Sequence, residues 1–554
     1  MKLKMPEKKQ SLWGFLLLSA LSLITQWYLF DFLLITKLLM PWLLYTSLLF
    51  IFRPFYAAIF VWLIECLFLR IHFLKMAFTN SPLEASDIFG WKQALFVRGY
   101  TDFLIPLLAL ALIVCAIKGL TFKKRQLLFL PAMLLVTTSC MQERHPTDYR
   151  VNPVSLLMRI AHVTYVDWNF ATNIKENGVL NHLFMTLPMG QIPLKGRVPF
   201  PVEEKRILSS KRGEKPDIFL VLCESCYTSS TDKFVTPMAD LAKEGFRKTT
   251  MISPVYGGMT AEAEFEVLTG LPSQRYKGID FQYFADSFSE EAKAFPRILL
   301  ENGYSTFSAH NNKGYFWRRN TIHPKFGFQK SYFLESMNWT GDEVPEDEVL
   351  FVKALNEYKN NLNTNKKTFA FLITLYTHGP YKEKNSDGGE SEYRDKLDKS
   401  IKQFVAFQKT IMTLASKKSR PVLFLIFGDH KPAMTVSFYK RHIFSDDFFT
   451  SKGHRNDSFL FADLSDSQRL IYGRVPLFVK ASGFKDETIA ENIVQEIRDK
   501  TIYCLPGVVV GKLQISYGFY DYLQNACKRT SEDLVDKLVI NNTFSEQIYG
   551  DLLF

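Results

Sequence analysis

The chain has 554 residues, with 67 Lys and Arg against 56 Asp and Glu, which gives a formal net charge of +11. Its mean hydropathy of −0.03 averages two unlike parts, because residues 1–141 are crowded with Leu, Phe, Ile and Trp while the remainder has the composition of a globular domain. No basic patch interleaved with aromatic residues occurs, so the excess charge does not indicate a nucleic-acid-binding protein.

Five apolar segments near the N-terminus approach the roughly 20 residues that an α-helix needs to cross a bilayer. They lie at about 12–30, 33–51, 54–70, 102–118 and 126–141. Lys and Arg residues precede the first segment and separate the fourth from the fifth, which predicts a cytoplasmic N-terminus. The basic residues of loop 71–101 argue weakly the other way. Five crossings would place everything after residue 142 outside the membrane.

One acidic residue falls inside these apolar segments. Glu65 lies in the third segment, and intramembrane acids are functional candidates by default. Arg70 follows five residues later, so a structural ion pair is the favoured interpretation.

The remaining chain divides by pattern into a connector and a large domain. Residues 142–213 indicate a helical connector, for example at Val154–Val163 and Gly178–Met185. In residues 214–554, short apolar runs alternate with amphipathic stretches, which predicts an α/β domain with a largely parallel sheet. The predicted fold is therefore an N-terminal α-helical transmembrane bundle followed by an extracytoplasmic α/β domain.

Polar residues follow four apolar runs of this domain. The runs, typical of strands buried on both faces, are Asp217–Cys223, Tyr304–Ser308, Thr368–Tyr376 and Val422–Phe427. Ligands of open α/β sheets bind beyond the carboxyl ends of the strands. The residues found there are Glu224, His310, His378, Asp429 and His430. Polar residues at the ends of four strands predict one shared site.

Glu224, Asp429 and His430 offer the oxygen and nitrogen ligands that suit a divalent cation such as Mn²⁺ or Zn²⁺. Taken singly, a strand-end Asp is more often a turn residue and a lone His is more often structural. Together, at matched strand ends, they predict a metal site.

The stretch Val255–Leu271 reads as a Gly-rich turn followed by a helix. Thr260 stands where a helix N-cap belongs, so it is either a capping hydroxyl or a nucleophile activated by a metal at the helix N-terminus. Of the glutamates in the first turns, Glu264 could support the site, but a solvated helix charge is the favoured interpretation.

Cys223 and Cys226 flank Glu224 at C-x-x-C spacing, which can indicate a redox pair or half of a zinc site. Strand alternation points Cys223 away from Glu224, so we interpret the carboxylate as the ligand and the cysteines as incidental. Oxidised pairs Cys223–Cys226 and Cys504–Cys527 stay open in an extracytoplasmic domain.

Taken together, the motifs make a family resemblance specific. GGMTAEAEFEVLTG, the Glu of LCES, SAHNNKGYFWRRN, LYTHGPY and FGDHKP occur in this order. The chain thereby resembles the lipoteichoic acid synthase-like phosphoglycerol transferases, which include the glucan phosphoglycerol transferases and belong to the alkaline phosphatase/sulfatase superfamily. The resemblance covers nearly the whole chain and is weakest across the connector and the C-terminal end.

The resemblance implies a role for each matching position. Thr260 would be the nucleophile, and His378 would assist at the attacking or leaving oxygen. The metal, with Mn²⁺ expected and Zn²⁺ or Mg²⁺ as alternatives, would be bound by Glu224, Thr260, Asp429 and His430. The phosphoglycerol head group would be bound by His310, Asn312, Trp317 and Arg319, although Asn312 stands where some members carry an acidic residue, which leaves the head group open.

The expected protein is a multi-pass enzyme of the bacterial plasma (inner) membrane with an extracytoplasmic, periplasmic catalytic domain. It would transfer phosphoglycerol from phosphatidylglycerol to a hydroxyl of a cell-envelope glycan or glycolipid through a covalent threonine intermediate. The alternatives are a phosphoethanolamine transferase that uses phosphatidylethanolamine, a sulfatase or phosphatase, and a non-catalytic lipid-binding protein. The C-x-P-x-R sequence of sulfatases is absent, since Tyr-Thr-Ser follows Cys226.

Overall fold

The protein is represented by a computed structural model, and the chain divides into two compact units, Met1–Gln191 and Ile192–Phe554. Each unit has its own hydrophobic core. The structure describes residues 7–30, 35–79, 83–88, 103–121, 158, 161, 163, 172–186, 215–228, 237–273, 285, 288–314, 316–341, 344–382, 387–451, 460–462, 464–515, 518–529 and 546–554.

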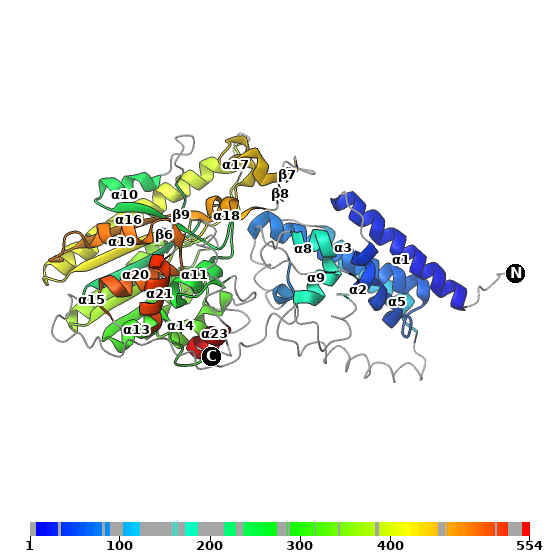
Figure 1. The fold of residues 1–554 in the computed structure, drawn as a ribbon, viewed down its shortest axis with the longest axis horizontal. Coiled ribbons are helices and arrows are strands. Elements are labelled where there is room, and N and C mark those ends of the chain that lie inside the picture. The colour runs from blue at the N-terminus through cyan, green and yellow to red at the C-terminus, as the bar shows by residue number, and fades with distance from the viewer. Residues whose placement is uncertain are drawn as a thin grey trace. The chain divides into compact units, whose positions relative to one another are not determined.

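The first unit is helical (Figure 1). Its elements are α1 (Glu7–Phe30), the 3₁₀ turn η1 (Ile35–Leu38), α2 (Leu39–Leu48), α3 (Pro54–Thr79), η2 (Ala85–Ile88), α5 (Leu104–Gly119), α8 (Thr172–Asn177) and α9 (Val179–Thr186). Within its described residues, two helices are long and apolar enough to cross a membrane, Lys9–Phe30 and Pro54–Met76.

Five spans are thus not confirmed. The first and third predicted segments correspond to α1 and α3, and the fourth corresponds to α5, which has 16 residues. The second segment contains α2, whose 10 residues are too few to cross a bilayer alone. The fifth, 126–141, and most of the predicted connector lie outside the described residues.

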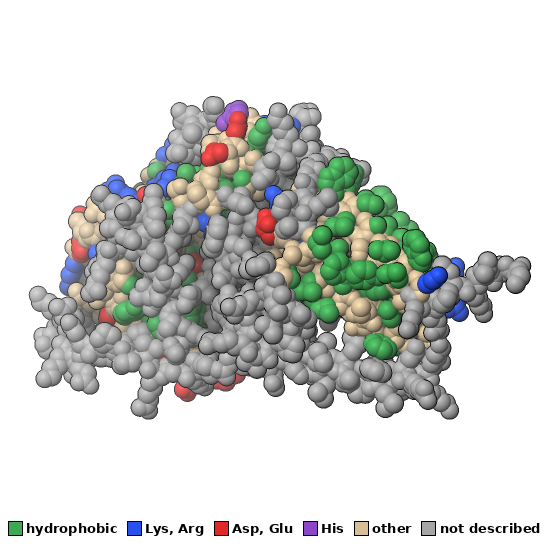
Figure 2. Space-filling view, turned by 45° about the vertical axis from the view of Figure 1, so that its right-hand side comes forward, with side chains coloured by type: hydrophobic (Ala, Val, Ile, Leu, Met, Phe, Trp, Pro, Cys, Tyr) green, Lys and Arg blue, Asp and Glu red, His purple; other side chains and the backbone are tan. Residues whose placement is uncertain are grey.

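Apolar side chains cover the outer faces of these helices. Figure 2 shows them as a broad hydrophobic surface. On α1 and α5 they include Leu12, Trp13, Leu16, Ile24, Trp27, Leu107, Leu110, Ile113 and Ile117, all exposed. Soluble proteins rarely expose a contiguous apolar area of this kind, which is typical of surfaces that contact lipid or protein.

Polar groups of the first unit meet between α1 and α3. Glu65, for which the sequence suggested Arg70 as a partner, is buried and accepts a hydrogen bond from Ser22 Oγ at 2.5 Å. Trp62 Nε1 donates to Thr25 Oγ1 at 3.0 Å. These bonds satisfy polar groups inside an otherwise apolar helix pair.

The second unit is built on an eight-stranded sheet with the order β10-β2-β9-β6-β1-β5-β3-β4. Only β9 runs antiparallel to its neighbours, which confirms the predicted, largely parallel α/β domain. The strands are β1 (Asp217–Cys223), β2 (Arg247–Ile252), β3 (Tyr304–His310), β4 (Lys330–Tyr332), β5 (Lys367–Ile373), β6 (Val422–Gly428), β9 (Arg474–Ser482) and β10 (Lys500–Thr501). A separate pair consists of β7 (Phe449–Ser451) and β8 (Leu460–Phe461).

Helices cover both faces of the sheet, and this explains the continuous apolar strands. Alternate side chains of a strand point to opposite faces, so Leu220 and Leu222 join one core while Phe219 and Val221 join the other. The first core includes side chains of α11 (Thr260–Thr269), α13 (Phe295–Glu301), α14 (Arg319–Lys325), α19 (Ile489–Ile497), α20 (Cys504–Lys512), α21 (Gly518–Arg529) and α23 (Glu546–Leu553). The second includes side chains of α10 (Asp240–Lys243), α15 (Asp347–Asn363), α16 (Glu390–Ser416) and α17 (Thr435–Lys440); α18 (Asp466–Gly473) precedes β9.

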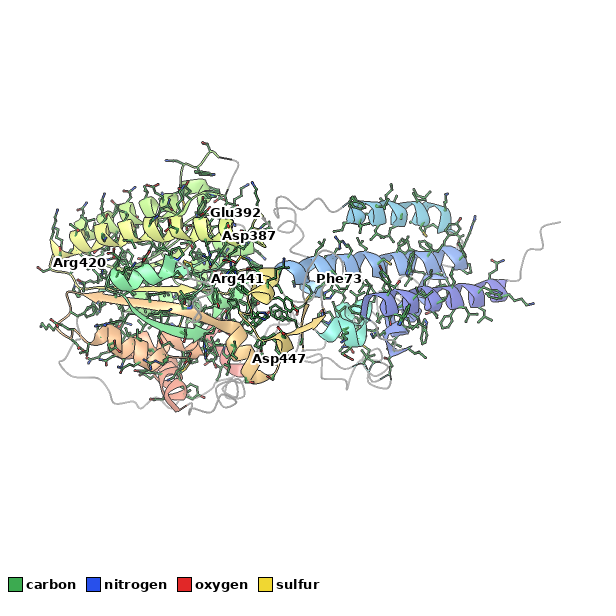
Figure 3. All side chains as sticks on the ribbon, turned by 90° about the horizontal axis from the view of Figure 1, so that it is seen from above. Phe73, Asp387, Glu392, Arg420, Arg441 and Asp447 are labelled. Atoms are coloured by element: carbon green, nitrogen blue, oxygen red, sulfur yellow. A yellow bond between two sulfur atoms is a disulfide. The ribbon has the colours of Figure 1, made fainter. Side chains whose placement is uncertain are left out.

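A buried ion pair joins β1 and β6 at their amino ends. Asp217 accepts hydrogen bonds from Arg420 Nε at 2.8 Å and from the Tyr358 hydroxyl at 2.9 Å. Figure 3 places Arg420 at the opposite end of this unit from Asp387 and Arg441, which lie beside α16 and α17. The carboxyl ends of the same two strands carry the polar residues predicted above.

Candidate metal centre

Glu224 follows β1 and Asp429 follows β6, and these strands are parallel neighbours with Cys223 opposite Gly428. Their side chains therefore leave the sheet side by side, and His430 comes next on the same turn. The ligand atoms of Glu224, Asp429 and His430 all lie within 4.8 Å of one another, and all three residues are buried. The predicted convergence of these strand-end residues is confirmed by this geometry.

The two turns pack tightly because of one glycine. A Cβ on Gly428 would lie 2.1 Å from the carbonyl oxygen of Cys226, so no larger residue fits there. Ser225 adopts a left-handed conformation with φ 53°, and its N–H donates to Asp429 Oδ1 at 2.8 Å. The Tyr393 hydroxyl donates to the Ser225 carbonyl at 2.8 Å. The backbone thus fixes Glu224 against Asp429.

Thr260 is the first residue of α11. The N-cap position belongs to Met259, which is left-handed with φ 63° and makes no side-chain cap bond. The Thr260 hydroxyl instead donates to Glu224 Oε2 at 3.1 Å and lies 3.5 Å from His430 Nε2. The capping alternative is therefore wrong, because the hydroxyl points at the cluster and not at its own helix.

The donor set fits a divalent cation. Asp429 Oδ2 is buried without a hydrogen-bond partner among the described residues, and it lies 3.2 Å from His430 Nε2. The other ring nitrogen, Nδ1, is 2.9 Å from the Lys431 carbonyl and donates to it, which leaves the Nε2 lone pair directed at the carboxylates. An orphaned carboxylate oxygen facing an imidazole lone pair is the arrangement that a cation satisfies.

The two carboxylates perturb each other. Burial, together with the neighbouring Glu224, raises the pKa of Asp429 to about 7. Burial also acts to raise the pKa of Glu224, but the charges of His378 and His430 bring it below its ordinary value. One carboxyl of the pair is held charged and the other is held near the point of protonation.

The predicted histidines lie on the next strands of the sheet. His310 ends β3 and is buried, with Nδ1 2.8 Å from the Ile373 carbonyl. Burial and the charges of Arg319 and His378 hold its pKa well below the usual range. His378 is exposed in the turn after β5 and acts electrostatically on both Glu224 and His310. The ionisable groups at the ends of β1, β3 and β5 therefore act on one another.

Arg319 is placed differently from a surface phosphate ligand. It is 1% exposed, and its Nε donates to Glu264 Oε2 at 2.8 Å. Glu264 is fully buried, so its interpretation as a solvated helix charge is wrong. Trp317 is half-buried with φ 55° and packs against the core. Asn312 is half-buried and accepts from the Lys313 N–H at 2.8 Å.

Asp347, at the start of α15, is a residue that the sequence did not single out. Its buried carboxylate accepts from Leu375 N at 3.0 Å and Tyr376 N at 3.2 Å, in the turn that leads to His378. It also accepts from Asn311 Nδ2 at 2.9 Å, next to His310, and from Ser400 Oγ at 2.6 Å. The only sequence signal for this role of Asp347 was an Asp at the start of a helix.

The cysteines are paired with each other. The structure contains disulfides Cys223–Cys226 and Cys504–Cys527. Neither Cys223 nor Cys226 has a thiolate to offer to a metal, so the interpretation as half of a zinc site is wrong.

Comparisons with known proteins identify similar chains in sequence and in structure. A protein of Rhizobium meliloti (strain 1021) assigned to cyclic beta-1,2-glucan modification is 24% identical over 319 residues, which cover 52% of this chain and 48% of the relative. The chain spans less than half the length of the curated relatives that it matches. The Streptococcus pyogenes phosphoglycerol transferase GacH, in complex with sn-glycerol-1-phosphate, is 16% identical with a TM-score of 0.43, covering 61% of this chain and 86% of that chain. The lipooligosaccharide phosphoethanolamine transferase A (EptA) of Neisseria meningitidis is 14% identical with a TM-score of 0.47, covering 92% and 98%.

A family model described as Sulfatase matches residues 216–495, a segment that contains the whole cluster. Because this segment is just over half of the chain, the protein belongs to the sulfatase family of the alkaline phosphatase/sulfatase superfamily.

Proposed function

We propose that the protein is a membrane-bound transferase that moves phosphoglycerol from phosphatidylglycerol to a hydroxyl of a cell-envelope glycan or glycolipid. The observation that carries this proposal is the Thr260 hydroxyl, which sits at a helix N-terminus and contacts Glu224 and His430. A helix N-terminus favours negative charge on a nucleophile and on the phosphate that it attacks.

Glu224, Thr260, Asp429 and His430 would hold the cation, for which Mn²⁺ is our first choice and Zn²⁺ or Mg²⁺ are alternatives. A bound divalent cation lowers the pKa of the hydroxyl and neutralises phosphate charge. In the chain itself, the Thr260 proton is directed at Glu224 Oε2, so a lone pair of Oγ1 is free to attack phosphorus.

In the first step, the bond from Thr260 Oγ1 to phosphorus forms and the bond from phosphorus to the diacylglycerol oxygen breaks. His378 is exposed and its charge acts on Glu224, and a histidine can exchange a proton near neutral pH. It donates a proton to the departing diacylglycerol oxygen. In the second step His378 removes the proton of the acceptor hydroxyl, whose oxygen attacks phosphorus as the bond to Thr260 Oγ1 breaks. The Thr260 proton, which passes to Glu224 Oε2 in the first step, returns to Oγ1 on release.

The head group would be bound by His310, Asn312, Trp317 and Arg319. A guanidinium matches phosphate oxygens with its parallel N–H groups. The half-buried indole of Trp317, two residues earlier in the chain, would offer an apolar wall for the glycerol. The assignment to cyclic beta-1,2-glucan modification of the Rhizobium relative supports the choice of a glycan acceptor.

The N-terminal helices would anchor the enzyme in the bacterial plasma (inner) membrane as a multi-pass protein, with the N-terminus cytoplasmic and the catalytic unit extracytoplasmic, in the periplasm. Their exposed apolar faces support this placement. A donor that never leaves the bilayer avoids the cost of transferring its acyl chains through water.

The test is intact-protein mass spectrometry of the full chain in detergent with Mn²⁺, offered phosphatidylglycerol or phosphatidylethanolamine, with Thr260→Ala alongside. We expect a phosphoglycerol increment that Thr260→Ala loses. A phosphoethanolamine increment would mean that the same mechanism acts on phosphatidylethanolamine, since Asn312 leaves the identity of the head group open. Metal-loaded protein that forms no adduct with either lipid would contradict the covalent transferase and favour a hydrolase.

A further inference from the structure

We propose that Glu264 is the positioning residue for Arg319, and that it ties the phosphate-binding guanidinium to the helix that carries the nucleophile. The inference rests on the proposed function, because it takes Arg319 as the group that binds the phosphate of the donor. Nothing in the reaction requires Glu264 itself to touch the substrate.

Thr260 and Glu264 are four residues apart on α11, so they lie on the same side of the helix, about 6 Å apart along its axis. Thr260 faces Glu224 and His430, whereas Glu264 faces α14. One helical turn therefore sets the distance between the attacking oxygen and the guanidinium. Residues on other helices could hold Arg319, but none would couple it so directly to Thr260.

Both oxygens of Glu264 are occupied inside the protein. Oε2 accepts from Arg319 Nε at 2.8 Å, and Oε1 accepts from His323 Nε2 at 2.7 Å. His323 Nδ1 in turn lies 2.7 Å from Ser308 Oγ on β3. Burial acts to raise the pKa of Glu264, but the Arg319 charge and the His323 hydrogen bond hold it below its ordinary value. The carboxylate is thus held by two side chains of α14, and one of them, His323, is itself held by β3.

The geometry of the pair distinguishes positioning from simple charge neutralisation. A buried arginine that only neutralises a carboxylate usually offers it two parallel N–H groups. Arg319 uses Nε alone, and among the residues that the structure describes its terminal nitrogens make one contact, from Nη1 to the Phe316 carbonyl at 3.4 Å. Nη2 makes no hydrogen bond to any described residue. The charge of Arg319 also lowers the pKa of His310, the last residue of β3.

The experiment measures the affinity of the full-length, Mn²⁺-loaded protein for sn-glycerol 1-phosphate by calorimetry, beside kcat and KM for phosphatidylglycerol. We expect Glu264→Gln to weaken binding by on the order of 10-fold, the lower end of what loss of a supporting partner costs. Glu266→Gln is the matched control, because Glu266 is also buried on α11 but bonds to Ser273. It should bind as the wild type does.

A double-mutant cycle separates positioning from stability. If Glu264 acts through Arg319, then Glu264→Gln changes binding by less than about 2-fold when Arg319 is already Ala. Independent effects of similar size in both backgrounds would overturn the proposal, as would wild-type affinity of Glu264→Gln. Should that variant not fold, Arg319→Lys keeps the ion pair but loses the planar fork, and retained binding would contradict Arg319 as the phosphate-binding guanidinium, on which the role of Glu264 rests.

The binding measurement also keeps this inference separate from the proposed function. A wild type that binds glycerol phosphate but forms no adduct with either lipid would contradict transfer and leave the role of Glu264 measurable. A metal-loaded wild type that binds no glycerol phosphate would overturn the role of Glu264 as stated.

Discussion

Glu266 shows how the neighbourhood of one side chain decides its protonation state. It lies two residues after Glu264 but faces the core, where it accepts from Ser273 N at 3.0 Å and has no basic partner among the described side chains. Burial raises its pKa from 4.5 to about 8. The folded protein therefore binds a proton at neutral pH that the unfolded chain does not bind.

This difference predicts a pH-dependent stability. Between pH 4.5 and about pH 8 the folded state holds more protons, so the free energy of unfolding falls as pH rises, by about 1.4 kcal/mol per pH unit for this one group. Glu266→Gln should remove that slope and be more stable than the wild type at pH 8. Thermal unfolding at several pH values measures it. Parallel curves for the two proteins would contradict the buried, protonated carboxyl.

Asp429 should control metal retention. Asp429→Asn keeps the shape of the side chain but replaces an orphaned carboxylate oxygen by an amide, so we expect Mn²⁺ affinity to fall by more than about 100-fold. Asp446→Asn, at an exposed aspartate, is the control and should retain the metal. Metal content after gel filtration measures the effect, and equal content in both variants would remove Asp429 from the ligand set.

At the scale of elements, α15 holds two strand-end turns in place through Asp347. Replacing it by Asn puts an amide NH₂ against hydrogen-bond donors and leaves some of them without an acceptor, which costs about 1–3 kcal/mol of stability. It should also loosen the turn that carries His378, so kcat should fall while Mn²⁺ content stays normal. Glu348→Gln, next to it but exposed, should change neither. Loss of Mn²⁺ in the Asp347 variant would mean that the damage spreads beyond this turn.

The sequence predicted the elements of the sheet better than the contacts between helices. The bounds of β1 agree with the prediction, and β3, β5 and β6 differ from it at their ends by one to three residues, because continuous apolar runs and strand-end polar residues are local signals. Glu264 was misinterpreted because its partners, Arg319 and His323, are 55 and 59 residues away. No periodicity within α11 reveals a partner that the fold brings from another helix.

The same limit applies to the N-terminal segments. Hydropathy detects apolar runs but not whether one run forms a single helix, and the run at 33–51 contains the short elements η1 and α2. Gly428 shows the opposite limit. The sequence shows a glycine before Asp429 and His430, but it does not show that the Cys226 carbonyl of another strand-end turn excludes any larger side chain there.

At the scale of the whole molecule, membrane attachment is the prediction. Because α1 and α3 carry long apolar faces, the full chain should stay in the membrane pellet after alkaline carbonate washing. Protease added to intact spheroplasts should digest the catalytic unit, since we place it outside. A chain found in the soluble fraction would contradict membrane anchoring. A catalytic unit protected from protease would mean that the orientation is the reverse of the one we propose.

The ion pair at the far end of the sheet bears on how the metal centre is assembled. Asp217 and Arg420 can meet only when β1 and β6 are in their native register, and that register places Cys223 opposite Gly428. A slip of one residue would shift Asp429 by about 3.3 Å and turn its side chain to the other face of the sheet. The pair thus forms only in the register that also aligns the metal ligands, although it lies roughly 20 Å from them. The arrangement of the metal ligands at one end of the strands therefore depends on a bond at the other end. The metal content of Asp217→Asn protein would show whether loss of that bond disturbs the ligands.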